Sequence, residues 1–214
     1  MTTLQDDADL KTLINTRRSL HAIAECLLAG PEFRASGEIA LRITPGGFGT
    51  TAGPGIRFEN GDLVATDGEH VPASGTYGAV AETLGIAFGA PEIGYADGSG
   101  ASAEQRIELA PGHARRITDW FALGDAALRL FAPDQTPVLW PEHFDVAVVV
   151  AGHSFGCSPG DDSYQRPYAY VSARDNDGSE FFNVIFGALR DADELPTTAD
   201  LVAFWREGLS RLAG

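Results

Sequence analysis

Residues 139–171 read LWPEHFDVAVVVAGHSFGCSPGDDSYQRPYAYV and contain the longest apolar run of the chain. The run at 146–151 predicts a central strand covered on both faces, because a strand with one face in water alternates apolar and polar side chains. The alternating Pro-Tyr-Ala-Tyr-Val at 167–171 predicts a second strand. The segment 152–166 between them is predicted to be a loop of about fifteen residues, a length that usually indicates a functional or disordered segment.

His143 and Asp145 lie just before the apolar run, and Glu142 is next to His143. If the strand already includes them, His143 and Asp145 point to one face with Cα atoms about 6.5–7 Å apart, close enough to act on one water molecule. If the protein is an enzyme, we expect His143, Asp145 and Glu142 to be its catalytic residues. The alternative is structural, a carboxylate that only holds the imidazole in place. No third ligand follows at a fixed spacing, so no metal site is predicted.

Other side chains of this stretch are expected to bind a ligand beside His143. They lie at the start of the stretch, around its Pro-Gly turn and on the second strand: Trp140, Ser158, Asp161, Tyr164 and Tyr168. The alternative for the acid is again structural, because carboxylates beside such turns often accept hydrogen bonds from the backbone.

The motif Gly-His-Ser-Phe-Gly at 152–156 matches the G-x-S-x-G nucleophile elbow of serine hydrolases, with Ser154 as the nucleophile. That elbow opens into a helix, whereas the turn sequence Cys-Ser-Pro-Gly follows here. The α/β-hydrolase order of serine, acid and histidine is also missing, since no histidine follows His153. Serine hydrolysis is therefore the weakest of the catalytic hypotheses.

A helix over 9–29 is predicted from apolar residues at helical spacing, with Gly30-Pro31 as its stop. Arg17 and His21 lie on or beside its apolar stripe, one turn apart, so we expect them to face other parts of the protein. They are predicted to bind the ligand together with His143. The alternative is that they satisfy buried polar groups.

The rest of the chain predicts an α+β fold. A helix is expected from Pro111 and a terminal helix after a cap at Thr197, while Asn60-Gly61 predicts a β-hairpin. We expect one domain over 1–214, in which a mainly antiparallel sheet of meanders and hairpins is covered by three longer helices.

Composition limits the partners. A net charge of -15 repels phosphate backbones and anionic lipids, so neither nucleic acid nor a membrane is expected. The acidic N-terminal residues do not resemble a secretory signal, and two cysteines make no disulfide framework, so a cytoplasmic location is expected. No cofactor fingerprint is present. The sequence fixes neither a cofactor nor an oligomeric state.

Several blocks resemble those of a family of uncharacterised bacterial proteins: Ser19-Leu-His21, Thr44-Pro-Gly-Gly-Phe48, Leu139-Trp-Pro-Glu-His-Phe-Asp145, Ser158-Pro-Gly-Asp161 and Pro167-Tyr-Ala-Tyr-Val171. The resemblance spans nearly the whole chain and implies no activity, because none is established for that family. We expect a small-molecule-binding or interaction domain. The alternative is a hydrolase or lyase that uses His143 with Asp145 or Glu142, with metal assistance from Asp161 or Asp162.

Overall fold

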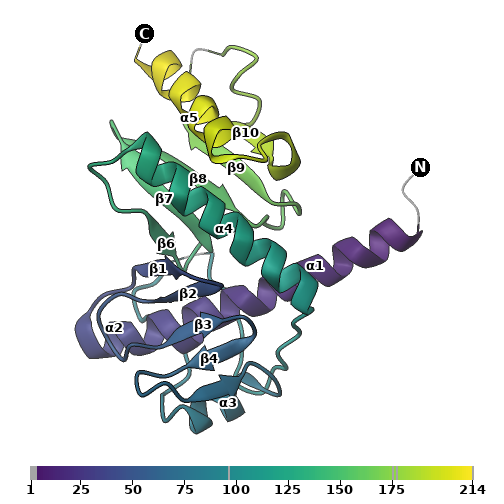
Figure 1. The fold of residues 1–214 in the computed structure, drawn as a ribbon, viewed down its shortest axis with the longest axis vertical. Helices are drawn as coiled ribbons and strands as arrows, with labels where there is room; N and C mark the ends of the chain where they lie inside the picture. The colour runs from purple at the N-terminus through teal and green to yellow at the C-terminus, as the bar shows by residue number, and fades with distance from the viewer. Residues whose placement is uncertain (1–3, 96, 175, 177, 214) are drawn as a thin grey trace. The chain divides into compact units, whose positions relative to one another are not determined.

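The computed structural model describes residues 4–95, 97–174, 176 and 178–213 (Figure 1). It combines helices with antiparallel strands, which confirms the α+β class. The chain divides into two compact units. Unit 1 is Met1–Asp119 with Leu139–Phe144, and unit 2 is Trp120–Val138 with Asp145–Gly214. The expectation of a single domain stays a prediction.

The first helix of unit 1 continues through Pro31, so the predicted stop at Gly30-Pro31 is wrong. The helical stretch consists of α1 (Leu4–Ala22), the π-helix η1 (Ile23–Ala29) and α2 (Gly30–Ser36). Pro31 has no N–H to donate to a carbonyl of the preceding turn. In a regular α-helix its ring would also collide with the carbonyl four residues earlier. The wider π turn, in which the Gly30 N–H bonds the Glu25 carbonyl, relieves this collision.

The strands of unit 1 pair antiparallel in the order β6-β1-β2-β3-β4-β5. They are β1 (Leu41–Thr44), β2 (Gly47–Thr50), β3 (Arg57–Glu59), β4 (Asp62–Val64), β5 (His70–Pro72) and β6 (Val138–Trp140), of which Val138 belongs to unit 2. Phe48 and Phe58 pair across β2 and β3, are fully buried and contribute to the core beneath η1. The Asn60-Gly61 turn, with φ of 52° and 104°, confirms the predicted hairpin.

A short helix and a long irregular segment complete unit 1. α3 (Tyr77–Thr83) is capped by the Thr76 hydroxyl, which accepts a hydrogen bond from the Ala79 N–H. The described residues between α3 and α4 form no strand apart from an isolated bridge of Thr76 with Arg106. α4 (Pro111–Phe131) then begins at Pro111, as predicted.

Unit 2 contains strands paired antiparallel in the order β7-β8-β9-β10. They are β7 (Asp145–Val150), β8 (His153–Ser158), β9 (Tyr168–Ser172) and β10 (Gly187–Asp191). The prediction of one long loop over 152–166 is wrong, because β8 occupies its first half. A tight turn at Ala151-Gly152, with φ of 52° and 83°, leads directly from β7 into β8.

Two glycines let the long helices of unit 2 approach its strands closely. A Cβ on Gly124 of α4 would lie 2.9 Å from the Cys157 sulfur, and one on Gly208 would lie 2.8 Å from the Val171 side chain. Gly208 lies in α5 (Thr198–Leu212), which follows the short 3-10 helix η2 (Ala192–Glu194). The predicted cap of α5 at Thr197 is confirmed. None of the helices in the described residues is long and apolar enough to span a membrane.

Candidate functional site

Three ionisable side chains follow one another at four-residue spacing along the helix of unit 1. Arg17 and Glu25 are only 5% and 2% exposed, and His21 between them is partly buried. Side chains at this spacing share one face of a helix. We call these three residues the helix row. The burial of Arg17 and His21 agrees with their predicted position on or beside the apolar stripe.

His21 is held in one orientation and one tautomer. Its Nε2 lies 2.7 Å from the Pro141 carbonyl oxygen, and its ring stacks on Phe144 with centroids 5.5 Å apart. Because a carbonyl only accepts, Nε2 carries the proton, and Nδ1 of the neutral ring is an acceptor. Burial lowers the pKa of His21, while Glu25 and the Pro141 carbonyl oppose that shift. His21 is therefore a neutral, oriented imidazole at pH 7.

The turn at 141–144 adds Glu142 and His143 beside the row. The Glu142 Oε2 atom is buried and has no hydrogen-bond partner among the residues that the structure describes. Glu142 also contributes to raising the pKa of Tyr95, so the two side chains are electrostatic neighbours. His143 is 58% exposed and lies 3.5 Å from Asp97, which is also exposed. Trp140 ends β6, half-buried, at the start of this turn.

His143 and Asp145 do not share a strand face, contrary to the prediction. Phe144 between them has φ of 51°, in the left-handed region, and β7 begins only at Asp145. A residue in that conformation breaks the alternation of side chains on which the predicted pair depended. The strand therefore includes the acid and excludes the imidazole.

Glu25 has well-defined partners that the sequence did not predict. Its Oε1 accepts a hydrogen bond from the Tyr95 hydroxyl at 2.7 Å, and its Oε2 accepts one from the Ser99 N–H at 2.8 Å. The Ser99 hydroxyl also bonds Oε2. A buried carboxylate needs such donors to remain charged. Its position four residues after His21 is a sequence signal that could have indicated Glu25.

Cys26 lies next to this carboxylate and is not a nucleophile. Burial and the charge of Glu25 raise the pKa of its thiol to about 12, although the Ser99 hydroxyl and Arg34 oppose this shift. The thiol donates weakly to Glu25 Oε2 at 3.7 Å. A group that stays protonated at neutral pH contributes packing and a weak hydrogen bond to this cluster.

In unit 2, the residues predicted around the Pro-Gly turn do come together. Asp161 Oδ1 accepts hydrogen bonds from the Ser163 and Tyr164 N–H groups at 2.6 and 2.7 Å, and Oδ2 accepts one from the Tyr168 hydroxyl at 2.6 Å. The Ser158 hydroxyl accepts one from the Gly160 N–H at 3.1 Å. These bonds favour the structural interpretation, in which Asp161 fixes the turn.

Asp145 also lies in unit 2 and has its own buried partner. It is 6% exposed and accepts a hydrogen bond from the Tyr170 hydroxyl. Burial raises the pKa of Tyr170 well above its usual value, and the negative charge of Asp145 adds to the shift. Tyr170 therefore stays protonated and serves Asp145 as a donor.

Ser154 does not occupy a nucleophile elbow. It lies inside β8 and pairs with Val149 across the hairpin, whereas an elbow places its serine on a turn from a strand into a helix. The residues of the G-x-S-x-G match thus belong to the β7–β8 hairpin.

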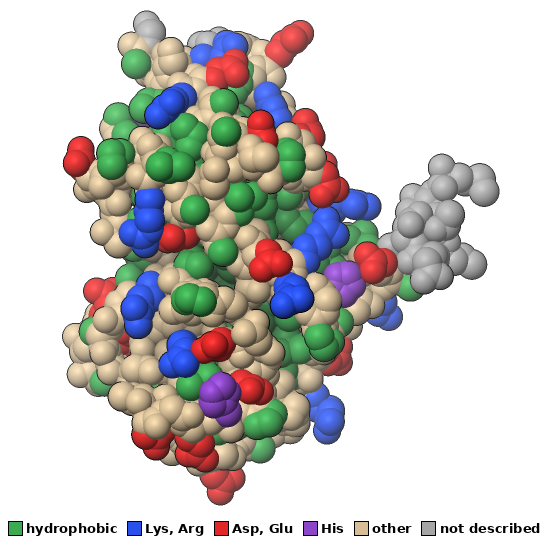
Figure 2. All heavy atoms as spheres, viewed as in Figure 1, with side chains coloured by type: hydrophobic (Ala, Val, Ile, Leu, Met, Phe, Trp, Pro, Cys, Tyr) green, Lys and Arg blue, Asp and Glu red, His purple; other side chains and the backbone are tan. Residues whose placement is uncertain are grey.

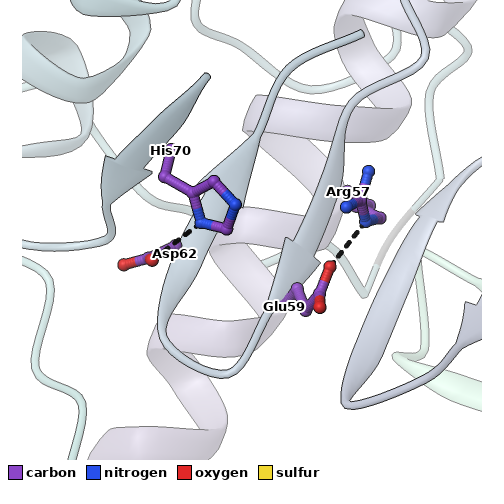
Figure 3. A network of polar contacts seen from close by, with 4 residues as sticks. All are labelled: Arg57, Glu59, Asp62 and His70. Atoms are coloured by element: carbon purple, nitrogen blue, oxygen red, sulfur yellow. Dashed lines mark hydrogen bonds and ion pairs between the residues drawn. The ribbon is translucent and has the colours of Figure 1, made fainter. Parts of the chain in front are cut away.

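Charged side chains form pairs on strands β3, β4 and β5 of unit 1. Arg57 bonds Glu59 at 2.7 Å, and His70 lies 3.1 Å from Asp62 (Figure 3). Acidic and basic side chains both occur on the face of the molecule shown in Figure 2. Such exposed pairs contribute only about 0–1 kcal/mol each. They make a mixed, solvated surface with no single sign of charge.

An open groove of about 370 Å³ lies along α4 and α5 of unit 2. It is lined by Leu130, Thr198, Ala199, Val202, Ala203 and Arg206. In the described part of the chain, no three His, Cys, Asp or Glu residues are arranged to hold a metal ion. In unit 1, the helix row and its neighbours form a concentration of oriented, buried polar groups, of which the sequence indicated Arg17 and His21.

No family model, curated protein or solved structure matches this chain. The resemblance to a family of uncharacterised bacterial proteins stays a prediction.

Proposed function

We propose that the protein binds a small polar molecule at the helix row and the adjoining Glu142. The observation that carries the proposal is the Glu142 Oε2 atom, buried and without a partner among the described residues. Leaving a buried acceptor unpaired costs about 1–3 kcal/mol, and more for a charged group. A ligand that donates a hydrogen bond to this oxygen would recover that energy.

The surrounding groups define the chemistry of the ligand. His21 bonds the carbonyl of Pro141, directly before Glu142, and its Nδ1 is an acceptor. Two acceptors on adjoining segments favour a molecule with two hydrogen-bond donors. Glu25 and Asp97 lie in the same cluster as Glu142, while Arg17 acts electrostatically on His21 and Arg34 acts on Cys26. This excess of carboxylates favours a cationic or neutral ligand over an anion.

Three small compounds distinguish cationic, neutral and anionic ligands experimentally. Ethanolamine carries an ammonium group, glycerol carries only hydroxyls, and propionate carries a carboxylate. Titration into ¹⁵N-labelled protein should shift amide resonances around His21 and Glu142 with ethanolamine, less with glycerol and not with propionate. Glu142→Gln should weaken ethanolamine binding about tenfold, because a hydrogen bond to a charged group is worth about 1.5–3 kcal/mol.

Glu69→Gln is the matched control. It makes the same chemical change on an exposed carboxylate of unit 1 and should leave the affinity unchanged. Equal affinities of the Glu142→Gln and wild-type proteins would overturn the proposed site. Resonance shifts with propionate alone would overturn the proposed ligand class.

The catalytic alternatives are less well supported, because most of their residues have other roles in the structure. His143 is exposed and paired with Asp97, Asp145 holds Tyr170, and Ser154 lies in a strand. A hydrolase or lyase would have to use Glu142 and His21 in place of the predicted pair. Binding without chemistry is the simpler function for these groups.

A cytoplasmic location and the exclusion of nucleic acid belong to the same proposal. Cys26 and Cys157 are both free, which suits a reducing compartment. The net charge of -15 opposes binding to a phosphate backbone.

A further inference from the structure

We infer that Tyr95 and Ser99 form a latch that closes on Glu25 and competes with the ligand for its carboxylate. The inference rests on the proposed function, because it concerns access to the same helix row. The latch is defined here as the three hydrogen bonds that these two residues donate to Glu25. When the latch is closed, the Glu25 carboxylate accepts hydrogen bonds from Tyr95 and Ser99. A bound ligand would donate hydrogen bonds of the same kind.

The latch satisfies both oxygens of Glu25 at once. One oxygen takes the Tyr95 hydroxyl and the other takes the N–H and hydroxyl of Ser99. Because Glu25 is only 2% exposed, these donors replace water around a buried charge. A ligand donor can reach Glu25 only if at least one of these bonds opens.

Gly98, directly before Ser99, lies against the carboxylate of Glu25. A Cβ on Gly98 would lie 2.4 Å from Glu25 Oε1 and 3.2 Å from the Tyr95 ring. Only a residue without a side chain allows the backbone to approach this closely. The closed position therefore depends on the absence of a side chain at Gly98.

Both ends of the latch segment are fixed to the rest of unit 1. On one side the Gly89 N–H bonds the Cys26 carbonyl at 3.1 Å, and the Arg34 guanidinium bonds the Gly89 carbonyl at 3.4 Å. On the other side the Gly78 N–H bonds the Ala103 carbonyl at 2.8 Å. These contacts anchor the segment whether or not the latch is closed.

Between these anchors the backbone has little support of its own. The described part of 90–101 contains a turn at Glu92-Ile93 but no helix or strand. Ile93 is 45% exposed. Segments with few buried contacts and few backbone hydrogen bonds open at low cost in free energy. The bonds to Glu25, together with the exposed Asp97–His143 pair at 3.5 Å, thus hold this span closed.

Hydrogen exchange of the full chain without ligand tests the latch. Tyr95→Phe and Ser99→Ala each remove a hydroxyl donor and keep the backbone, and each should speed exchange of the 92–101 amides about tenfold. Ser102→Ala is the matched control, because Ser102 lies in the same loop, is exposed and leaves the latch intact. Unchanged exchange in both latch variants would overturn the latch.

Titration with ethanolamine tests the competition. Because ligand binds only the open fraction, Tyr95→Phe should bind ethanolamine several-fold more tightly than the wild-type protein. Faster exchange with equal or weaker binding would overturn the competition while leaving the loop dynamics established. If ethanolamine binds neither protein, the proposed function and the competition both fail, whereas the exchange rates alone still decide whether the latch exists.

Discussion

The backbone carbonyl of Cys26 accepts a hydrogen bond from the Gly89 N–H at 3.1 Å. In the π-helical register this carbonyl faces Pro31, which has no N–H to offer. The loop after α3 therefore supplies the bond that the helix itself cannot make. Pro31, which lacks an N–H, thus accounts for both the π turn before it and the anchoring of the loop at Gly89.

Gly30→Ala should destabilise the protein strongly, because the same contact leaves no room for a side chain. A Cβ at Gly30 would lie 1.7 Å from the Gly89 carbonyl oxygen, so the backbone would have to move. We expect a loss of about 3 kcal/mol in the free energy of unfolding, measured by urea denaturation.

Gly112→Ala is the control, since Gly112 is also helical and has no atom within 4 Å of its Cβ position. It should be neutral or stabilise by up to about 1 kcal/mol. Similar effects of the two substitutions would show that the Gly30 contact is not tight.

Stability should fall in mildly acidic solution because of His21. Burial lowers its pKa in the folded protein below the usual value of 6.5, so below that pH the unfolded chain binds more protons than the folded one. The contribution of the neutral imidazole is complete above pH 6.5 and is lost as the pH falls toward the lowered folded pKa, by at most about 1.4 kcal/mol per pH unit.

Urea denaturation at several pH values between about 7.5 and 5 measures this loss. His21→Gln should remove the His21 part of the pH dependence, whereas His70→Gln, which alters an exposed ring, should keep the wild-type slope. An identical slope for the His21→Gln and wild-type proteins would contradict the prediction.

Local signals in the sequence predict the elements that are set by neighbouring residues. Asn60-Gly61 has the positive φ values of its hairpin turn, and Thr197 caps α5 through Asp200 three residues later. In both cases the residues that determine the structure lie within one turn of each other. Propensity and capping chemistry are then sufficient.

The errors arise where distant contacts override those signals. Pro31 remains inside a helix because Gly89 compensates for it, and Phe144 and Ala151 have positive φ although neither is a typical turn residue. The partners of Glu25 lie 70 and 74 residues away in sequence, in a segment with no periodic pattern. A sequence pattern could indicate that the helix row is buried, but not what covers it.

Asp161→Ala should destabilise unit 2. Its carboxylate fixes the turn through the Ser163 and Tyr164 N–H groups and anchors the Tyr168 hydroxyl. Removing these acceptors should cost about 2 kcal/mol in the free energy of unfolding, measured by urea denaturation. Asp134→Ala, on an exposed turn of the same unit, should change it by less than about 0.5 kcal/mol. A loss of the same size in both variants would contradict the structural role of Asp161.

Neither cysteine should react with iodoacetamide in the native protein at about pH 8. Burial raises the pKa of Cys26 to about 12 and that of Cys157 well above its usual value, and the thiolate is the reactive form. Mass spectrometry should therefore find no alkylation before unfolding and two labels in concentrated guanidinium chloride.

Opening the latch by Tyr95→Phe should expose Cys26, whose sulfur lies 3.8 Å from the Ser99 hydroxyl oxygen. Cys157 should stay protected and serves as an internal control. Rapid labelling of Cys157 in the native wild-type protein would contradict the burial on which the prediction rests.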